Sequence, residues 1–536
     1  MRRVLTLALA VAVLGVAVPG AWAQPAAPTP QVTITGFIDT ITGWSKNLQD
    51  NLPTRTGDKE WYARNRGRFD IIGQLGTAKA VFGFEIDSAW GTTAIGGQDN
   101  NLAAGGVGAQ RSGATSAFDI NTDTQGSIET KWLYTEFQVP MMPFPMIVRV
   151  GAQPFAAQYK LAAYANGDFA GVNVDMNFTP NVKAHFTYVA AEENLTGSRR
   201  SIGFGRGDDW AIIASVEVTP IKGLDIRPIY SFFQATGSTS GSARNAVGGI
   251  GGTPTFTRSA IGGVGGLGMY ESRHTIGVDA RWRFGPFSLD PTAFYQFGRR
   301  DTDNPFGPAL NSNTREADIS AWFFDVIGGW RLGPLLVEAR YMYTSGNRPK
   351  DQLSRDVNYY QNLDADTSYW AAGWGEIYSL GIDYFSGAIR GLGNSIGLDR
   401  YGRQQFGVRA TYSVTPAFDV RAVVSPAWTA KSIDTDGTAV LFGTGGTTPQ
   451  LLCATHTANS AANPRGAGCN GDSSYLGTEV DLGLTWRFAP GLTFDLVGAV
   501  LFAGGALDSS EVLNGVLTKR DAKNIYTIAS RIRYSF

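Results

Sequence analysis

Three arginines at alternate positions, Arg64, Arg66 and Arg68, have the spacing in this sequence that most clearly suggests a chemical role. Alternate residues of an extended strand share one face, and each step along that face covers about 7 Å because one residue advances about 3.4 Å. Asp70 continues the same face. Fixed guanidinium groups in such a row attract anions when they line a water-filled space. The row therefore predicts an electrostatic strip along one wall.

Other charged residues in period-two stretches are expected to face the same side: Glu85, Asp87, Arg281, Arg283, Arg409, Arg531 and Arg533. Two arrangements are open. The arginines can act together as an anion-selective strip, or each arginine can pair with a carboxylate so that acidic and basic residues set up a field across the lumen. Acids at the expected inward positions are numerous enough for pairing, so we favour the second arrangement.

The histidines give little basis for catalysis. The chain contains only His185, His274 and His456, and it lacks HExxH and CxxCH motifs. His274 shares its strand parity with apolar residues, and no activated serine is expected beside His185 or His274. We therefore predict that the chain is not an enzyme and carries no cofactor. The formal net charge of −1 also argues against nucleic acid as a partner.

The two cysteines, Cys453 and Cys469, lie in a stretch rich in glycine, alanine, asparagine and threonine. In an oxidising compartment we expect them to form one disulfide that closes a loop. A metal site that includes His456 is the alternative, but this ligand set and spacing match no zinc pattern. Loop acids such as Asp434 and Asp436 lack the later glutamate of a calcium loop. No metal site is predicted.

Strands must position these residues, because apolar side chains recur at every second position through most of the chain. One example is the run Val480, Leu482, Leu484 and Trp486, which alternates with Asp481, Thr485 and Arg487. Such runs are about ten residues long, the length that a tilted strand needs to cross a bilayer. The pattern predicts an all-β fold, a transmembrane antiparallel β-barrel.

Short and long connections alternate between these runs. Short turns such as Gly285-Pro286 and Gly333-Pro334 alternate with long connections such as 91–127 and 237–270. Short periplasmic turns and long extracellular loops produce this alternation in outer-membrane barrels. With one further strand at each end of the chain, the turns predict about 18 strands, with a range of about 16–20 that depends on the ambiguous stretch Trp374–Tyr384.

A repeated motif marks the ends of three strands. It reads Trp-Arg-Phe-Gly-Pro at Trp282–Pro286, Trp-Arg-Leu-Gly-Pro at Trp330–Pro334 and Trp-Arg-Phe-Ala-Pro at Trp486–Pro490. Tryptophan favours the headgroup region of a membrane, and proline ends a hydrogen-bonded ladder because it lacks an N–H donor. The motif predicts an aromatic girdle at one membrane surface.

The N-terminus has the features of a secretory signal. A basic start is followed by an apolar run and by Ala21-Trp22-Ala23, which predicts a signal peptide over residues 1–23 that is cleaved before Gln24. A membrane anchor helix is the alternative, but the apolar run is short for a full crossing. We expect residues 24–31 to form a short periplasmic segment and residues 32–536 to form a single barrel.

The C-terminus resembles the last strand of bacterial outer-membrane β-barrels. Tyr534 and Phe536 end a run in which apolar residues alternate with Arg531, Arg533 and Ser535. In those barrels a final phenylalanine after alternating aromatic residues helps the assembly machinery to recognise the chain. The resemblance therefore implies an assembly signal at Tyr534 and Phe536. It also implies a location in the bacterial outer membrane, with lipid, lipopolysaccharide and the barrel assembly machinery as partners.

The features taken together resemble bacterial porins as a class. Members of that class admit small hydrophilic solutes by passive diffusion, often as trimers with a loop folded inward, and barrels of about 16–18 strands leave water inside. The resemblance implies a homotrimeric porin that is anion-leaning if the arginine strip dominates. A substrate-specific channel or conduit is one alternative, and a structural or surface-array barrel with a plugged lumen is another. The candidates for the constricting loop are 91–127, Ala156–Asn166 and 347–402.

Overall fold

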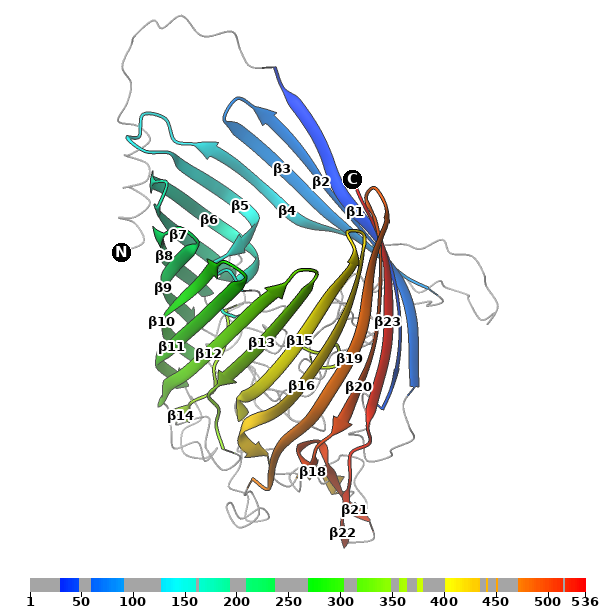
Figure 1. The fold of residues 1–536 in the computed structure, drawn as a ribbon. Helices are drawn as coiled ribbons and strands as arrows, with labels where there is room; N and C mark the ends of the chain where they lie inside the picture. Colours follow the sequence, from blue (N-terminus) through cyan, green and yellow to red (C-terminus); the bar gives the residue numbers. More distant parts are fainter. Residues whose placement is uncertain are drawn as a thin grey trace, which may run out of the picture.

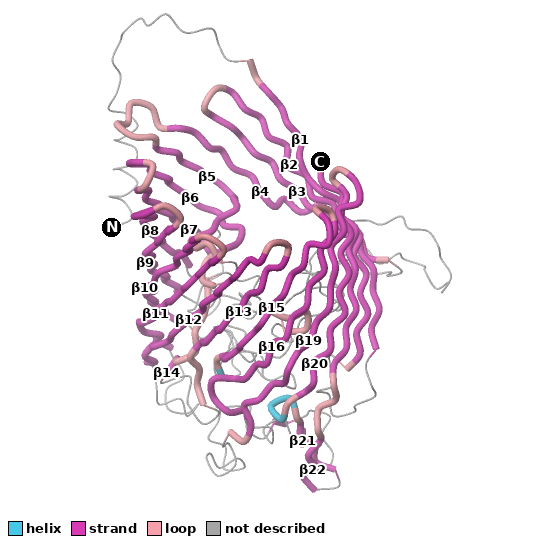
Figure 2. The backbone as a smooth tube through the Cα atoms, in the orientation of Figure 1, coloured by secondary structure: helices cyan, strands magenta, loops and turns pink. Residues whose placement is uncertain are grey.

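The computed structural model consists almost entirely of β-strands and their connections (Figures 1 and 2). Within the described part, no helix is long and apolar enough to span a membrane. The residues that the structure describes are 29–47, 59–90, 127–160, 163–192, 209–236, 269–302, 316–348, 356–363, 374–378, 401–433, 440–441, 450–451, 471–513 and 516–536.

Nineteen strands of the described chain share one sheet, and one of them, β14 (Asp356–Val357), is a two-residue strand parallel to β12. The other eighteen form an antiparallel ladder that closes because β1 pairs with both β2 and β23. The predicted closed barrel of eighteen strands is therefore confirmed. The barrel strands are β1 (Gln31–Lys46), β2 (Lys59–Leu75), β3 (Ala78–Ala89), β4 (Ser127–Gln138), β5 (Met146–Ala156), β6 (Asn166–Thr179), β7 (Val182–Glu192), β8 (Asp209–Ile221), β9 (Leu224–Thr236), β10 (Met269–Phe284), β11 (Phe287–Thr302), β12 (Glu316–Leu332), β13 (Leu335–Thr344), β15 (Arg403–Thr415), β16 (Phe418–Ile433), β19 (Ser473–Ala489), β20 (Leu492–Ala503) and β23 (Ile525–Ser535).

A small second sheet lies in the long connections. It has four short strands in the order β18-β17-β21-β22. A single 3-10 turn, Gly505–Leu507, precedes its third member along the chain. The strands are β17 (Val440–Leu441), β18 (Gln450–Leu451), β21 (Ser509–Leu513) and β22 (Val516–Arg520).

Tight turns join the strands in pairs at one rim, which is the upper one in Figures 1 and 2. Gly285 and Gly333 have φ angles of 58° and 56°, a left-handed conformation that glycine adopts without a steric penalty. Each is followed by a proline, whose ring fixes φ near −65°. This sign pattern suits the two-residue hairpin turns that match the twist of neighbouring strands. The Gly-Pro turns expected from the sequence are present.

The first and last strands close the barrel. β1 and β23 pair from Phe37 opposite Ser535 to Lys46 opposite Tyr526. The backbone N–H of Gly36 donates to the Phe536 carbonyl at 3.0 Å, and the Phe536 N–H donates to the Gly36 carbonyl at 3.0 Å. No strand edge of the barrel is therefore left open along this junction, which satisfies the main requirement for backbone at membrane depth.

The outer face carries two aromatic rows with an apolar zone between them. Eight positions separate His274 from Trp282 and likewise Trp322 from Trp330 on neighbouring parts of the wall. Eight residues span about 27 Å along a strand, which tilt reduces toward the apolar height of about 25 Å that is typical of outer-membrane barrels. Neighbouring rings are in contact along the row at the long-loop rim, with centroids 4.2 to 5.4 Å apart in Trp210–Phe232, Phe232–His274, His274–Phe297 and Tyr295–Trp322; the His274–Phe297 pair is stacked.

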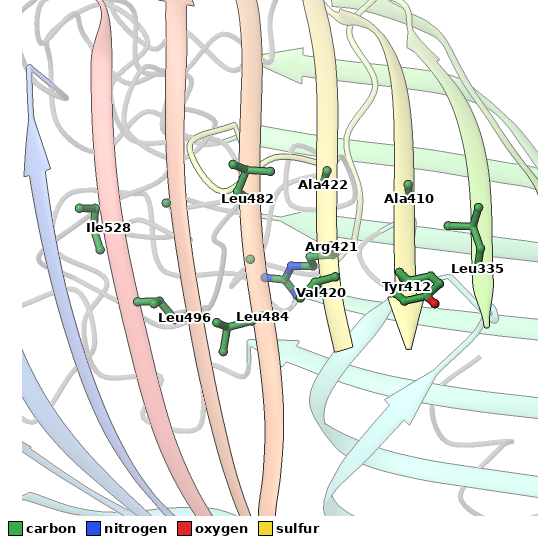
Figure 3. A pocket seen from close by; sticks show the side chains of 12 residues that line it. Leu335, Ala410, Tyr412, Val420, Arg421, Ala422, Leu482, Leu484, Leu496 and Ile528 are labelled. Carbon is green, nitrogen blue, oxygen red and sulfur yellow. The ribbon is translucent and has the colours of Figure 1, made fainter. Parts of the chain in front are cut away.

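A shallow hollow of about 590 Å³ interrupts the apolar zone (Figure 3). Small residues at Ala410, Ala422 and Gly498 create it, and Leu482 stands at its edge with 67% of its surface exposed. Leu482 belongs to a band of exposed apolar side chains around the barrel, and a soluble protein rarely exposes so large a contiguous apolar surface to water, whereas lipid accepts it.

Leu482→Arg is expected to lower the free energy of unfolding in lipid by about 2–4 kcal/mol, since a cation in the middle of the apolar zone loses its hydration. Phe488→Arg, on the same strand at the girdle beyond Trp486, is the control and should cost about 0–1 kcal/mol. Denaturant unfolding in vesicles, followed by tryptophan fluorescence, measures both. Equal costs at the two positions would contradict the assignment of this face to lipid.

Candidate functional site: the lumen and its two inner segments

The chain between β5 and β6 folds into the barrel. This first inner segment comprises residues 157–165, of which 161 and 162 lie outside the described residues. Ala163, Tyr164 and Ala165 are at most 2% exposed, and the Ala157 N–H donates to the Ala165 carbonyl at 2.8 Å. Small side chains let this segment lie close against the wall. The stretch Ala156–Asn166 was one of three candidates for an inward loop, and it is one that enters the lumen.

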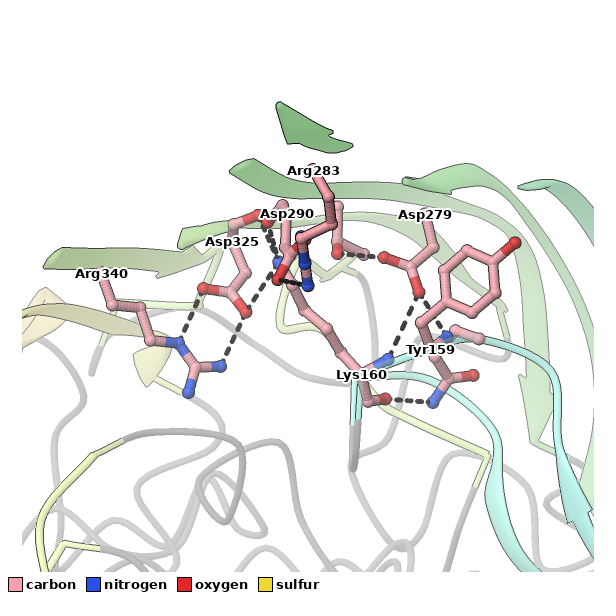
Figure 4. A network of polar contacts seen from close by, with 9 residues as sticks. Tyr159, Lys160, Asp279, Arg283, Asp290, Asp325 and Arg340 are labelled. Carbon is pink, nitrogen blue, oxygen red and sulfur yellow. Dashed lines mark hydrogen bonds and ion pairs between the residues drawn. The ribbon is translucent and has the colours of Figure 1, made fainter. Parts of the chain in front are cut away.

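Two buried aspartates of the wall hold the first inner segment (Figure 4). The Asp279 Oδ2 atom accepts hydrogen bonds from the backbone N–H groups of Tyr159, at 2.5 Å, and Lys160, at 3.3 Å. The Lys160 ammonium lies 3.3 Å from Asp325 Oδ2, and Arg340 donates to both oxygens of Asp325 at 2.8 and 2.7 Å. Asp279 and Asp325 are fully buried. Charge-assisted bonds of this kind are the strong ones in proteins, so the segment is firmly fixed.

Lys160 crosses from the inner segment to the wall. Its side chain is 9% exposed, and its ammonium also donates to the Asp290 carbonyl at 2.5 Å and the Asp325 carbonyl at 3.0 Å. Burial lowers the pKa of the Lys160 ammonium from its ordinary value, and the nearby Asp325 carboxylate acts in the opposite direction.

The Tyr159 ring lies between two arginines. Its hydroxyl donates to Glu217 Oε2 at 2.8 Å. The guanidinium carbons of Arg227 and Arg281 lie 4.4 and 4.3 Å from the ring centroid, within the range of cation–π contacts. Arg227 also pairs with Glu217. Tyr159 of the first inner segment is thus bound to the charged wall by one hydrogen bond and two cation–π contacts.

A second inner segment, residues 356–363 and 374–378, packs on the first. The Tyr360 hydroxyl donates to the Ala163 carbonyl at 2.8 Å, and the Leu363 N–H donates to the Tyr164 carbonyl at 2.7 Å. The 347–402 candidate therefore also enters the lumen in its described part, and residues 374–378, the described part of the ambiguous stretch Trp374–Tyr384, do not form a strand. The third candidate, 91–127, lies almost wholly outside the described residues.

Two carboxylates of β19 bind the far end of the second inner segment. Glu479 accepts hydrogen bonds from the backbone N–H groups of Ile377 at 2.6 Å and Tyr378 at 2.9 Å. Asp481 accepts one from the Glu376 N–H at 3.1 Å. Gly375 has a φ of 124°, and a Cβ atom there would lie 2.3 Å from Glu479 Oε2. Consecutive amide groups thus form a concave site that encloses a carboxylate, as amide nests do for anions.

An apolar cluster lies inside the barrel where the inner segments meet the wall, and we did not anticipate it. Strands β8, β9, β11 and β12 contribute inward apolar side chains, which pack on Tyr164 and Tyr360. The sequence does contain an indication of this cluster. Every residue from Trp210 to Ala214 is apolar, so neither face of this strand segment is polar and the inner face needs an apolar cover. The wall residues of the cluster include Ala211, Ile213, Ile229, Phe233, Phe294, Ala321 and Phe323.

The arginine ladder lies on the inner face of β2 beside the acids of β3. Arg66 binds Asp87 through Nε at 2.8 Å and Nη2 at 2.6 Å, and Glu85 lies 3.1 Å away. Arg64 lies 3.6 Å from Asp87. Arg68 stacks on Trp132, with its guanidinium carbon 4.0 Å from the ring centroid. Within the described chain Arg68 has no ion pair, and Asp70 Oδ1 has no hydrogen-bond partner.

The remaining arginines singled out in the sequence each have a carboxylate partner. Arg281 pairs with Asp225, Arg283 with Asp290, Arg409 with Glu338, Arg531 with Asp495, and Arg533 with Asp39. The side chains of Arg281 and Arg283 are 46% and 52% exposed, whereas Arg66 is 2% exposed. Pairing thus extends from the exposed rim to the buried wall.

No activated serine was expected beside His185 or His274, but a serine does stand at a cross-strand position. Ser215 lies directly opposite His185 on the adjoining strand, and His185 Nδ1 lies 2.6 Å from Asp175 Oδ1. The His185 Nε2 atom nevertheless has no hydrogen-bond partner among the residues described. Asp175, His185 and Ser215 therefore lack the hydrogen bond between serine and histidine that activates a nucleophile.

The remaining site predictions fall elsewhere. Cys453, Cys469 and His456 lie outside the described residues. His274 is on the outer face, where it stacks on Phe297 with the planes 10° apart. Over the described ranges, no group of histidine, cysteine and acidic residues could hold a metal ion.

The apolar belt, the closed ladder and the charged interior define an outer-membrane β-barrel of the channel fold. No protein-family model matches the sequence, and the search of curated proteins found no match. Among solved structures, the chain is similar to OccK8 (OprE) of Pseudomonas aeruginosa at 10% identity and a TM-score of 0.46, over 94% of this chain and 98% of that chain. It is also similar to OpdL of the same organism at 7% identity and a TM-score of 0.45, over 94% and 99%. The assignment of the fold rests on the ladder of this chain itself.

Proposed function

We propose that the chain is a selective outer-membrane channel for small hydrophilic solutes, rather than an unrestricted diffusion pore. The observation that carries the proposal is the pair of inner segments, which buried ion pairs and amide–carboxylate bonds hold inside the barrel. Side chains that occupy the lumen narrow the space for water, so a solute must fit the polar groups that remain. This supports the substrate-specific alternative over the general porin.

Pairing of the inward arginines supports weak charge selectivity. Each ion pair presents both signs to a passing solute, so a net attraction for anions comes only from a cation without a counter-ion. Arg68 forms no ion pair within the described chain, although Asp70 lies near enough to interact with its charge, which favours a slight preference for anions.

The other partners belong to the same proposal. We propose that residues 1–23 are removed on export, that Tyr534 and Phe536 guide the assembly machinery, and that the barrel lies among lipid and lipopolysaccharide as a homotrimer. The hollow around Ala422 and the aromatic rows are compatible with lipid contact. No cofactor and no enzymatic activity are part of the proposal.

A planar bilayer experiment tests the function. Purified barrel should give discrete conductance steps. In a KCl gradient the reversal potential should be small and should have the sign of a preference for chloride over potassium. The transported solute should block the current in a saturable way. Large conductance steps that no tested solute blocks would instead support a general porin. Complete absence of steps would favour the second candidate, a plugged structural barrel, which the apolar cluster inside the lumen supports.

A further inference from the structure

The two inner segments are attached to the wall by different chemistry. Asp325, which holds the first segment, has both Lys160 and Arg340 as ion-pair partners. Glu479 and Asp481, which hold the second, form no ion pair with any residue that the structure describes. Two backbone N–H groups donate to Glu479, whose other polar neighbour is the Asp481 carboxyl group, and Asp481 Oδ1 has no hydrogen-bond partner in the described chain. The second attachment therefore combines these two carboxylates, which form no ion pair in the described chain, with the Tyr378 hydroxyl, which donates to the Gly477 carbonyl at 2.8 Å, and Gln405, which donates to the Trp374 carbonyl at 2.7 Å.

Each element around these two carboxylates contributes few charged groups. β16 places Ser425 and Val423 opposite them and brings Arg421 near Asp481. β20 places Leu501 and Ala499 on the other side. The inner segment contributes Glu376 and Tyr378, and β15 contributes Arg403, 6.0 Å from the Tyr378 ring. In the acidic range only the carboxylates of this set change charge.

We propose that Glu479 and Asp481 are an acid-released latch: their carboxylates hold residues 374–378 across the lumen, and protonation frees this part of the second inner segment. The idea rests on the proposed channel function and adds its regulation. A carboxylate binds an amide N–H more strongly than a protonated carboxyl group does, because the bond loses its charge assistance. Protonation at Asp481 Oδ1 breaks no hydrogen bond of the described chain, and it is opposed by the Glu376 N–H bond to Oδ2 and by the charge of Arg421.

Single-channel recording of Glu479→Gln/Asp481→Asn tests the latch. The amide variants keep the shape of both side chains and remove the charge that the three N–H groups bind. At neutral pH the conductance step should be about twofold above that of the unaltered protein, because a wider lumen carries more ions. The unaltered protein should approach the same step as the pH falls, and the double variant should lose this pH dependence.

Asp419→Asn is the matched control, since Asp419 is a lumen carboxylate paired with Arg487 at the rim. It should keep both the neutral step and the pH response. A double variant that retains the neutral step and the pH profile of the unaltered protein overturns the latch and leaves the channel intact. Absence of steps in the unaltered protein overturns the channel proposal instead. Resistance to heat on a gel confirms that each variant has folded as a barrel.

Discussion

Asp325→Ala is expected to destabilise the barrel by about 3–5 kcal/mol, because it leaves two buried cations without their counter-ion. Arg340 loses both of its hydrogen bonds to Asp325. Lys160, whose side chain is only 9% exposed in the unaltered protein, loses its ion pair. The first inner segment should also detach from β12. Denaturant unfolding of the barrel in detergent micelles gives the change in free energy, and single-channel recording should show noisier and larger steps.

Asp419→Ala provides the comparison. It removes an ion pair of similar length, 2.8 Å to Arg487, but that arginine is 50% exposed at the rim. An exposed pair contributes less than about 1 kcal/mol, since water replaces the lost partner. If the two variants lose equal stability, the network around Lys160 does not fix the inner segment.

A large change in ion selectivity is expected when the acids of β3 are neutralised. Glu85→Gln/Asp87→Asn removes the carboxylates beside Arg64 and Arg66, while all three cations of the ladder remain. One unit charge acts on an ion about 4 Å away in water with about 1 kcal/mol, which is about a fivefold change in occupancy. The ratio of chloride to potassium permeability should therefore rise by about fivefold or more, and the reversal potential in a KCl gradient should shift toward the equilibrium potential of chloride.

The matched control keeps the net charge. Arg66→Gln/Asp87→Asn removes one cation and one anion from the same place, so the reversal potential should stay near that of the unaltered protein. A shift of similar size in both variants would show that the shape of the lumen, rather than its charge, sets selectivity.

The barrel was predictable because residues close together in the sequence determine its strands and turns. Turn residues such as Gly285 and Gly333 specify hairpins from their own backbone preferences, and period-two alternation follows from the geometry of a single strand. The inward arginines were also found in this way, since parity alone decides which face a residue takes. Their partners required the register between strands, which a one-residue slip would reverse.

The contents of the lumen were not predictable by the same means. Tyr360 binds the carbonyl of Ala163 across 197 positions of sequence, and no local pattern records such a contact. Lys160, Asp325 and Glu479 appear in the sequence as ordinary members of a loop and of alternating strands. The one usable signal was apolarity on both faces of strands such as Trp210–Ala214, which indicates that something covers the inner face.

The junction of β1 with β23 has a consequence for how the molecule forms. The Arg533 side chain donates to Asp39 Oδ1 at 2.6 Å across 494 positions of sequence, almost the whole length of the chain. Contacts of such separation form slowly, because the entropy of closing a very long loop is lost before the contact stabilises anything. Until closure, both terminal strands expose unpaired backbone groups that can join another chain. Hairpins between strands that follow each other in the sequence can form early, so the rate of this closing step decides the competition between a finished barrel and aggregation.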